Sequence, residues 1–186
     1  MNYKDYIWDL GGTLLDNYET STLAFLKTLE EFNLSASHDA VFSKLKESTA
    51  IAITTFAPYE PHFLHFYKLN EAQALANPIW KSGAKEILRK IVADGGRNFL
   101  VSHRDRQVIY LLSHANLLEY FTEVVTSEEG FKRKPDPESI LYLINKYDIT
   151  NALVIGDREI DKQAGQGAGL ESLLVQENQS LLEIVN

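Results

Sequence analysis

Short, mainly apolar segments alternate along the chain with segments of helical periodicity. The clearest apolar segments are residues 6–10, 98–102 and 152–156, and each is followed by polar or glycine residues and then by a helical pattern. Residues 123–126 and 172–175 are weaker strand candidates. Helices are expected at 105–115 and 137–147, and a third, capped by Ser82 and stopped by Gly95-Gly96, has apolar positions at Ala84, Ile87, Leu88, Ile91 and Val92. This alternation predicts an α/β fold with a doubly wound, Rossmann-like parallel sheet.

Residues 17–77 have a different pattern, in which helical spacing dominates and strand signals are weak. An apolar stripe recurs there at helical intervals, at Leu23, Leu26, Leu29 and Phe32. The competing strand candidate is a β-branched run at 51–55. About sixty such residues are too many for a simple crossover between parallel strands. We therefore expect a small helical domain at 17–77, inserted into an α/β core formed by residues 1–16 and 78–186.

Composition and charge limit the function without identifying it. The chain has 186 residues, of which 45% are hydrophobic and 24% charged, as in a typical globular protein. Its net charge of −8 argues against partners such as nucleic acid or an anionic membrane surface. There is no cysteine, so a disulfide, a thiol nucleophile and a zinc–thiolate site are excluded. The first residues do not resemble a signal peptide and no apolar run reaches membrane-spanning length, so we expect a cytoplasmic protein, either a monomer or a homodimer.

The segment DLGGTLLD at residues 9–16 is the first candidate for chemistry. It places Asp9 where a predicted buried strand meets a glycine turn, and α/β proteins bind ligands at such strand ends. A carboxylate there could be a nucleophile, a metal ligand or both, although an Asp that caps the turn is the simpler alternative. Gly11 stands two residues later, where a second carboxylate would be useful.

Three further segments carry polar groups near predicted strand ends. Ser102 closes the second strand and could hold a phosphate oxygen or cap a helix. Lys134 lies in a loop stiffened by prolines and could meet an anion, although a basic solvated loop is the ordinary explanation. Asp157 and Asp161 would suit a hard cation such as magnesium. The alternative for this pair is a helix cap and an exposed side chain.

These segments together have the order and placement that aspartyl-phosphate chemistry requires. They offer a nucleophilic Asp, a hydroxyl, a lysine and a carboxylate pair, all at one edge of one predicted sheet. On these motifs the chain resembles the haloacid dehalogenase-like (HAD) hydrolase superfamily, in the branch that inserts a helical cap after the first motif. Phosphoglycolate phosphatases and β-phosphoglucomutases belong to that branch. The resemblance spans essentially the whole chain.

The resemblance implies a function and a set of residues that contact the substrate. Asp9 would be the nucleophile, and Lys134 would bind the phosphoryl group and orient Asp9. Ser102, with the adjacent His103, would complete the substrate site. The implied enzyme is a phosphatase that acts on a small phosphorylated metabolite through an aspartyl-phosphate intermediate.

The resemblance also implies a Mg²⁺ site. Asp9 and Asp157 would bind the metal directly, and Asp161 would ligate it or support it through another group. The backbone carbonyl of Gly11 could coordinate the metal as well, since that contact needs no side chain.

Gly11 is the departure from the family pattern. Family phosphatases carry a second Asp there, which protonates the leaving group and then deprotonates the attacking water. Such help is worth about 10²–10⁴ in rate, or about 3–5 kcal/mol of barrier. Without it, alkyl phosphates should be poor substrates, whereas acyl or aryl phosphates, whose leaving groups are stable anions, should suffer less. A replacement acid or base could come from His103, His62 or His65, although structural, partly buried histidines are the simpler explanation.

Two alternatives of a different kind stay open. A regulatory protein could keep the phosphate and magnesium site and turn over little or nothing. Phosphonoacetaldehyde hydrolases, which cleave a C–P bond, also have a small residue at this position and use a cap lysine as a Schiff base. Lys27, Lys44 and Lys46 lie in the insertion, where surface lysines are the usual explanation. Dehalogenases do not use magnesium, and the Gly156-Asp157 pair argues against that chemistry.

Overall fold

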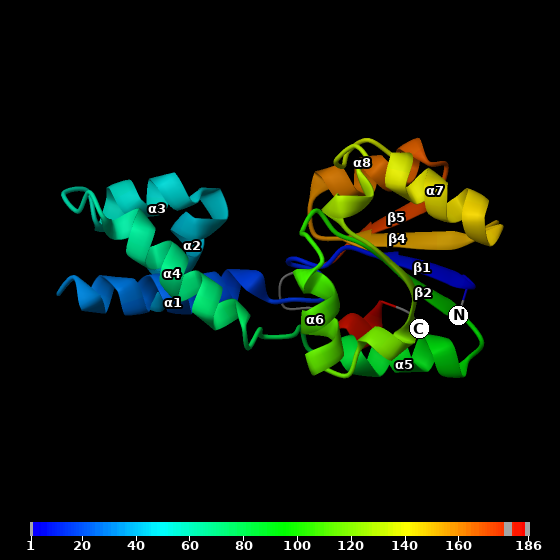
Figure 1. The fold of residues 1–186 in the computed structure, drawn as a ribbon, viewed down its shortest axis with the longest axis horizontal. Helices are drawn as coiled ribbons and strands as arrows, with labels where there is room; N and C mark the ends of the chain where they lie inside the picture. The colour runs from blue at the N-terminus through cyan, green and yellow to red at the C-terminus, as the bar shows by residue number, and fades with distance from the viewer. Residues whose placement is uncertain (1, 177–179, 185–186) are drawn as a thin grey trace. The chain divides into compact units, whose positions relative to one another are not determined.

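The core of the molecule is a parallel sheet of five strands in the order β3-β2-β1-β4-β5 (Figure 1). A computed structural model describes residues 2–176 and 180–184. The strands are β1 (Asp5–Trp8), β2 (Arg97–Val101), β3 (Phe121–Val125), β4 (Ala152–Gly156) and β5 (Glu171–Leu174). All neighbouring strands pair in parallel, so the predicted doubly wound α/β fold is confirmed, including its two weaker strands.

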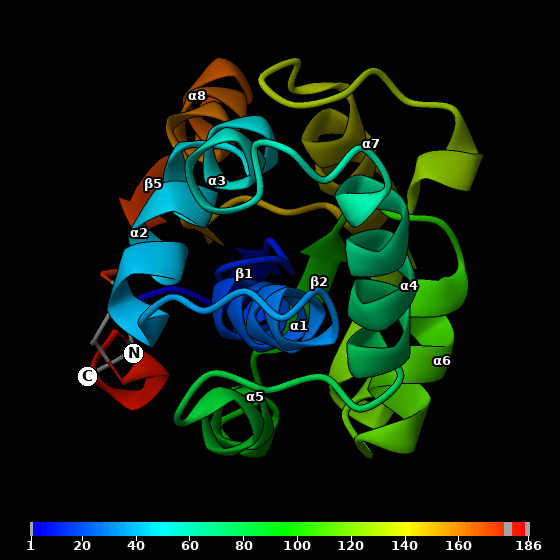
Figure 2. The ribbon, with the colours of Figure 1, turned by 90° about the vertical axis from the view of Figure 1, so that its left-hand side faces the viewer.

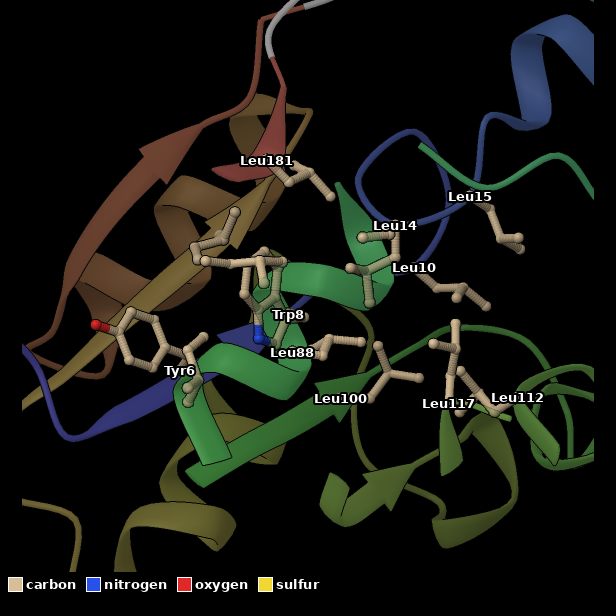
Figure 3. Close-up of a cluster of buried hydrophobic side chains, with 14 of the residues drawn as sticks. Tyr6, Trp8, Leu10, Leu14, Leu15, Leu88, Leu100, Leu112, Leu117 and Leu181 are labelled. Atoms are coloured by element: carbon tan, nitrogen blue, oxygen red, sulfur yellow. The ribbon is translucent and has the colours of Figure 1, made fainter. Parts of the chain in front are cut away.

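Helices cover both faces of this sheet (Figures 1 and 2). One face packs against α5 (Ala84–Ala93) and α6 (Gln107–His114), and the other against α7 (Glu138–Tyr147) and α8 (Glu159–Gly167). Short 3₁₀ turns lie at Leu118–Tyr120 (η1), Ser127–Glu129 (η2) and Leu181–Glu183 (η3). Because side chains alternate along a strand, Tyr6 and Trp8 enter the first cluster, drawn in Figure 3, while Ile7 enters the second.

Two polar groups are buried in the sheet with their hydrogen bonds satisfied. Asn98 accepts a hydrogen bond from Trp8 Nε1 at 2.9 Å and donates to the carbonyls of Leu88 and Tyr120. At the first residues of the same strands, Arg97 and buried Asp5 form a two-pronged ion pair, with N···O distances of 2.6 and 2.9 Å. These contacts tie β1 to β2 and β2 to α5, so they help to fix the register that positions the strand ends.

The predicted cap of α5 is wrong. Its N-cap is Gly83, which has a φ of +80°, and no side chain caps the helix. The left-handed backbone at the N-cap position favours glycine. Ser82 lies one residue earlier, and its carbonyl accepts a hydrogen bond from the Leu181 amide. The helices predicted at 105–115 and 137–147 are confirmed as α6 and α7, each slightly shorter than expected.

The chain divides into two compact units, one of which is Asp16–Ile79. This unit contains α1 (Asn17–Glu31), α2 (His38–Glu47), α3 (Thr49–Phe56) and α4 (Phe63–Leu75), and α1 packs against α2 and α4. Its interior is aromatic, since the Phe25 ring lies 4.9 Å from that of Phe63 and 5.2 Å from that of Tyr67.

The structure excludes the strand candidate in this helical unit and corrects the expectation for two histidines. The β-branched run at 51–55 is part of α3, because Ser48 caps the helix and the Thr54 and Thr55 hydroxyls bond to carbonyls one turn back. Leu23, a member of the apolar stripe, is 46% exposed. His62 and His65 are exposed rather than partly buried. Among the described residues, no helix is long and apolar enough to cross a membrane.

Candidate active site

The carboxyl ends of β1, β2 and β4 bring the candidate residues to one edge of the sheet. Asp9 follows β1, the central strand, and its amide donates to the Ile155 carbonyl of β4 at 2.8 Å. On the other side of β1, Ser102 follows β2 and donates its amide to Val125 of β3 at 2.9 Å. Both residues are buried at the ends of their strands. The sheet edge therefore holds a carboxylate and a hydroxyl from neighbouring strands, which is where α/β proteins bind ligands.

Lys134 is buried within this edge. Its ammonium lies 2.5 Å from Asp9 Oδ1 and 2.5 Å from Asp161 Oδ1, and donates to the Val101 carbonyl at 3.3 Å. The residue is only 6% exposed, and the peptide bond to Pro135 is cis. A solvated basic loop, the alternative explanation for this segment, is therefore excluded. A buried ammonium with these partners lowers the cost of gathering carboxylates here and offers a cation to an incoming anion.

Three carboxylates converge beside this lysine. Oxygens of Asp9, Asp157 and Asp161 lie within 4.8 Å of one another. Asp161 Oδ2 accepts a hydrogen bond from the Arg158 amide at 3.1 Å, and its Oδ1 pairs with Lys134. Asp9 Oδ2, Asp157 Oδ1 and Asp161 Oδ1 are buried and accept no hydrogen bond within the described part of the chain, although Asp161 Oδ1 has its ion-pair contact with Lys134.

These unsatisfied oxygens fit a small, hard cation. A buried carboxylate oxygen without a donor is costly, and a divalent cation that prefers oxygen ligands would satisfy two of them at once. Asp9 and Asp157 are the residues that would hold it, with Asp161, whose oxygens also contact Lys134 and the Arg158 amide, beside them. The role of Asp161, as a ligand or as a support, stays a prediction.

Two glycines make room for this cluster. A Cβ on Gly12 would lie 2.1 Å from Asp157 Oδ2, and Gly12 has a φ of +81°. A Cβ on Gly156 would lie 2.2 Å from the Asp161 Cβ. Any larger residue at either position would push a carboxylate away, so both glycines belong to the site. The sequence pattern placed Gly12 in a glycine turn and Gly156 at the end of a strand, and it did not indicate this packing role.

Burial raises the pKa values of two of these carboxylates, Asp9 and Asp157. Burial raises the pKa of Asp9, and the nearby Lys134 ammonium opposes this effect only in part. Burial, followed by the charges of Asp9 and Asp161, raises the pKa of Asp157 to about 6. A bound cation would favour the ionised form of both carboxylates and would therefore lower both pKa values.

The remaining predicted residues lie near this cluster with specific partners. The Ser102 hydroxyl oxygen accepts a hydrogen bond from the Arg104 amide at 3.2 Å, which leaves its own proton for an acceptor. His103 Nε2 accepts a hydrogen bond from the Lys134 amide at 2.8 Å. Gly11 forms an isolated bridge with Leu15 and, unlike Gly12, does not have a positive φ. Its predicted contact with a metal stays a prediction.

The insertion lysines have ordinary surface surroundings. Lys27 contacts Gln73 and Glu31, and Lys44 pairs with Glu47 at 2.6 Å. Lys46 lies over the rings of Tyr18 and Phe42. None of the three is buried. A Schiff-base lysine needs a desolvated or electrostatically strained environment, which this unit does not give them.

Comparison with known proteins identifies the family of the chain. Residues 6–175 match the family described as haloacid dehalogenase-like hydrolase. A crystal structure of a hydrolase from Streptococcus pneumoniae TIGR4 is 55% identical, with a TM-score of 0.93 over 99% of this chain and 97% of that chain. A HAD family hydrolase from Deinococcus radiodurans R1 shares the fold at 21% identity, with a TM-score of 0.78 over 98% of this chain and 87% of that chain.

A relative found by sequence comparison also matches over most of the chain. Pyrophosphatase PpaX from Oceanobacillus iheyensis is 24% identical over 94% of this chain and 84% of its own length. The family match covers most of the chain, including Asp9, Ser102, Lys134 and Asp157. The protein is therefore a hydrolase that belongs to the haloacid dehalogenase-like family.

Proposed function

We propose that the protein is a Mg²⁺-dependent phosphohydrolase in which Asp9 is the nucleophile. The observation that carries the proposal is the state of the Asp9 carboxylate: Oδ1 is held by Lys134 at 2.5 Å, while buried Oδ2 accepts no hydrogen bond from the described residues. The contact through Oδ1 thus fixes the orientation of the carboxylate, while Oδ2 keeps lone pairs that are free to bond to the metal and to phosphorus. A nucleophile needs both properties.

The proposed reaction has two displacements. An Asp9 oxygen bonds to phosphorus, the bond from phosphorus to the leaving oxygen breaks, and the electron pair departs with the leaving group. Water then attacks the aspartyl phosphate, giving inorganic phosphate and returning Asp9 to its carboxylate form. Lys134 stabilises the phosphoryl oxygens, and the Ser102 hydroxyl donates to one of them. Mg²⁺ held by Asp9 and Asp157 would neutralise phosphoryl charge.

Gly11 restricts the leaving group. No carboxylate stands at position 11 to protonate a departing alkoxide, and the His103 Nε2 lone pair is engaged by the Lys134 amide. The favoured substrates therefore carry a leaving group that is stable as an anion, namely an acyl, aryl or phosphoryl group. The relatives named pyrophosphatase support the last of these, because phosphate is the group that leaves from pyrophosphate.

The helical unit is proposed to act as a cap that selects a small phosphorylated metabolite. Its two connections lie side by side, since the Asp16 amide donates to the Ile79 carbonyl at 2.8 Å and Leu15 bridges Trp80. Such paired linkers suit a unit that moves as one body during catalysis. Phosphonate cleavage is disfavoured because the lysines of this unit lie at its surface.

A second candidate is a regulatory protein that binds phosphate and Mg²⁺ without turnover. Gly11 is the observation that favours it, because the usual general acid is missing. The buried Asp9–Lys134 pair favours the enzyme, since an orienting lysine on a carboxylate with a free oxygen has no evident use in simple binding.

Turnover of p-nitrophenyl phosphate with Mg²⁺ tests the choice. We expect release of nitrophenol by the wild-type protein, loss of that activity in Asp9→Asn and after EDTA, and little change in the control Asp94→Asn, which alters an exposed carboxylate on the core. An Asp9→Asn protein as active as wild type would remove Asp9 from its role. Binding of phosphate and Mg²⁺ without turnover of aryl, acyl or pyrophosphate substrates would favour the regulatory protein.

A further inference from the structure

His103 contacts the backbone of the lysine that organises the site. The Lys134 amide donates to His103 Nε2 at 2.8 Å, and Arg133 Nε lies 3.4 Å from the other ring nitrogen, Nδ1. Backbone amides and guanidinium groups can only donate. A neutral imidazole has one lone pair to accept with, so only one of these two contacts can be a hydrogen bond.

Distance assigns the lone pair to Nε2. The contact from the Lys134 amide is 2.8 Å, whereas the Arg133 contact of 3.4 Å is long for a hydrogen bond. The proton therefore lies on Nδ1, and the ring is neutral. Burial, followed by the positive charges of Lys134, Arg133 and Arg158, lowers the pKa of His103 to about 4, which agrees with a neutral ring at physiological pH.

Two residues at the end of β2, on either side of Ser102, therefore hold Lys134. The Val101 carbonyl accepts from the ammonium at 3.3 Å, and His103 accepts from the backbone amide at 2.8 Å. Between them stands Ser102, whose hydroxyl oxygen accepts from the Arg104 amide. The segment thus bonds to Lys134 both at its ammonium and at its backbone amide. The His103 contact thus adds a second hydrogen bond between Lys134 and the end of β2.

We propose that His103 is a positioning residue, which in its neutral Nδ1–H form holds the Lys134 backbone so that the ammonium reaches Asp9. It is neither the missing general acid nor a direct ligand of the substrate through Nε2, because that atom is committed to the Lys134 amide. The effect on turnover rests on the proposed function. The hydrogen bond and the tautomer do not.

The direct test is ¹⁵N NMR of the full chain at pH 7. We expect the His103 ring to be the neutral Nδ1–H tautomer, with a through-hydrogen-bond coupling between the Lys134 amide nitrogen and Nε2. His103→Leu identifies the signals among the five histidines. An Nε2–H tautomer or an imidazolium at pH 7 would overturn the proposal even if the protein had no phosphatase activity.

Kinetics of two variants test the consequence. His103→Leu removes the acceptor and should lower kcat for an aryl phosphate about 10-fold, because small misplacements of an orienting group are costly. His103→Gln places an acceptor oxygen near the Nε2 position and should recover most of that loss, at a similar melting temperature. His114→Leu, which alters an exposed histidine on α6, is the control. Equal losses in the Leu and Gln variants would mean that the ring itself takes part, and would overturn the positioning role.

Discussion

The ammonium of Lys134 lies 2.5 Å from an oxygen of Asp9, a residue 125 positions away in the sequence. The same ammonium lies 2.5 Å from Asp161, so one buried cation is shared by two buried carboxylates, with Asp157 close by. The net charge of this group is negative. Under the proposed function, this charge would attract Mg²⁺, and the bound Mg²⁺ together with Lys134 would attract an anionic substrate.

Lys134→Met should destabilise the protein most strongly when divalent metal is absent. The substitution leaves the three carboxylates without their cation, and removing one partner of a buried ion pair typically costs about 3–5 kcal/mol. Urea unfolding in EDTA and in Mg²⁺ measures this cost, and Mg²⁺ should recover part of it. Lys132→Met is the matched control, since Lys132 has a 73% exposed side chain in the same loop. Equal stability of Lys134→Met and wild type in EDTA would contradict the electrostatic account.

Asp157→Asn should have opposite effects with and without metal. The folded-state pKa of about 6 lies above the usual 3.8, so the folded protein binds this proton more tightly than the unfolded chain does. The metal-free wild type should then lose up to about 3 kcal/mol of stability as the pH rises from about 4 to about 6. An Asn cannot ionise, so in EDTA the variant should exceed wild type at pH 7 and match it below pH 4.

In Mg²⁺ the order should reverse. Wild type should gain about 2.7 kcal/mol when free Mg²⁺ is a hundredfold above its Kd, and the variant should gain much less. Thermal or urea unfolding across pH in both buffers measures the crossover. Glu159→Gln, at an exposed neighbouring carboxylate, should show neither effect. A wild type that gains stability between pH 4 and 6 in EDTA would mean that Asp157 is not held in a desolvated site.

Gly12→Ala should disturb the metal site beyond its backbone cost. A left-handed φ costs a non-glycine residue about 1–2 kcal/mol, and here the new Cβ would also lie 2.1 Å from Asp157 Oδ2. Gly95→Ala has the same φ of +81° with nothing within 4 Å of its Cβ, so it isolates the backbone term. Both variants should lose stability, but only Gly12→Ala should lose the stabilisation by Mg²⁺. Retention of that stabilisation would show that Asp157 can move aside without cost.

The sheet and the location of the site could be predicted because both depend on local patterns. Continuous apolar segments predict buried parallel strands, and the carboxyl ends of such strands meet at one edge. The boundaries of β1 show the limit of this reasoning: residues 9 and 10 were expected in the strand, but Asp9 already lies beyond it. The strand alternative for residues 51–55 failed because β-branched propensity is weaker than a good cap and tertiary packing, which the Ser48 side chain and buried Ala52 provide.

Contacts between distant segments could not be predicted in the same way. The sequence does not distinguish a solvated Lys134 from a buried one, because its partners lie in other elements and the decisive contact spans 125 residues. The positioning role proposed for His103 depends on a hydrogen bond from the Lys134 backbone amide, which no sequence pattern identifies. The same holds for Gly12, because a Cβ at this position is excluded only by the Asp157 side chain that packs against it in the fold.

Gly11→Asp should broaden the activity toward alkyl phosphates. Gly11 does not have a positive φ, so an Asp can adopt the backbone there without the strain expected at Gly12. A carboxyl group at this position could protonate a departing alkoxide, and general acid–base help is worth about 10²–10⁴ in rate. We therefore expect kcat/KM for an alkyl phosphate to rise by about 10²-fold, with little change for an aryl phosphate, whose leaving group needs no proton. Gly11→Asn controls for shape and polarity without a titratable proton. A similar rise in both variants would trace the gain to substrate contacts, and no rise in either would mean that another group already supplies the proton.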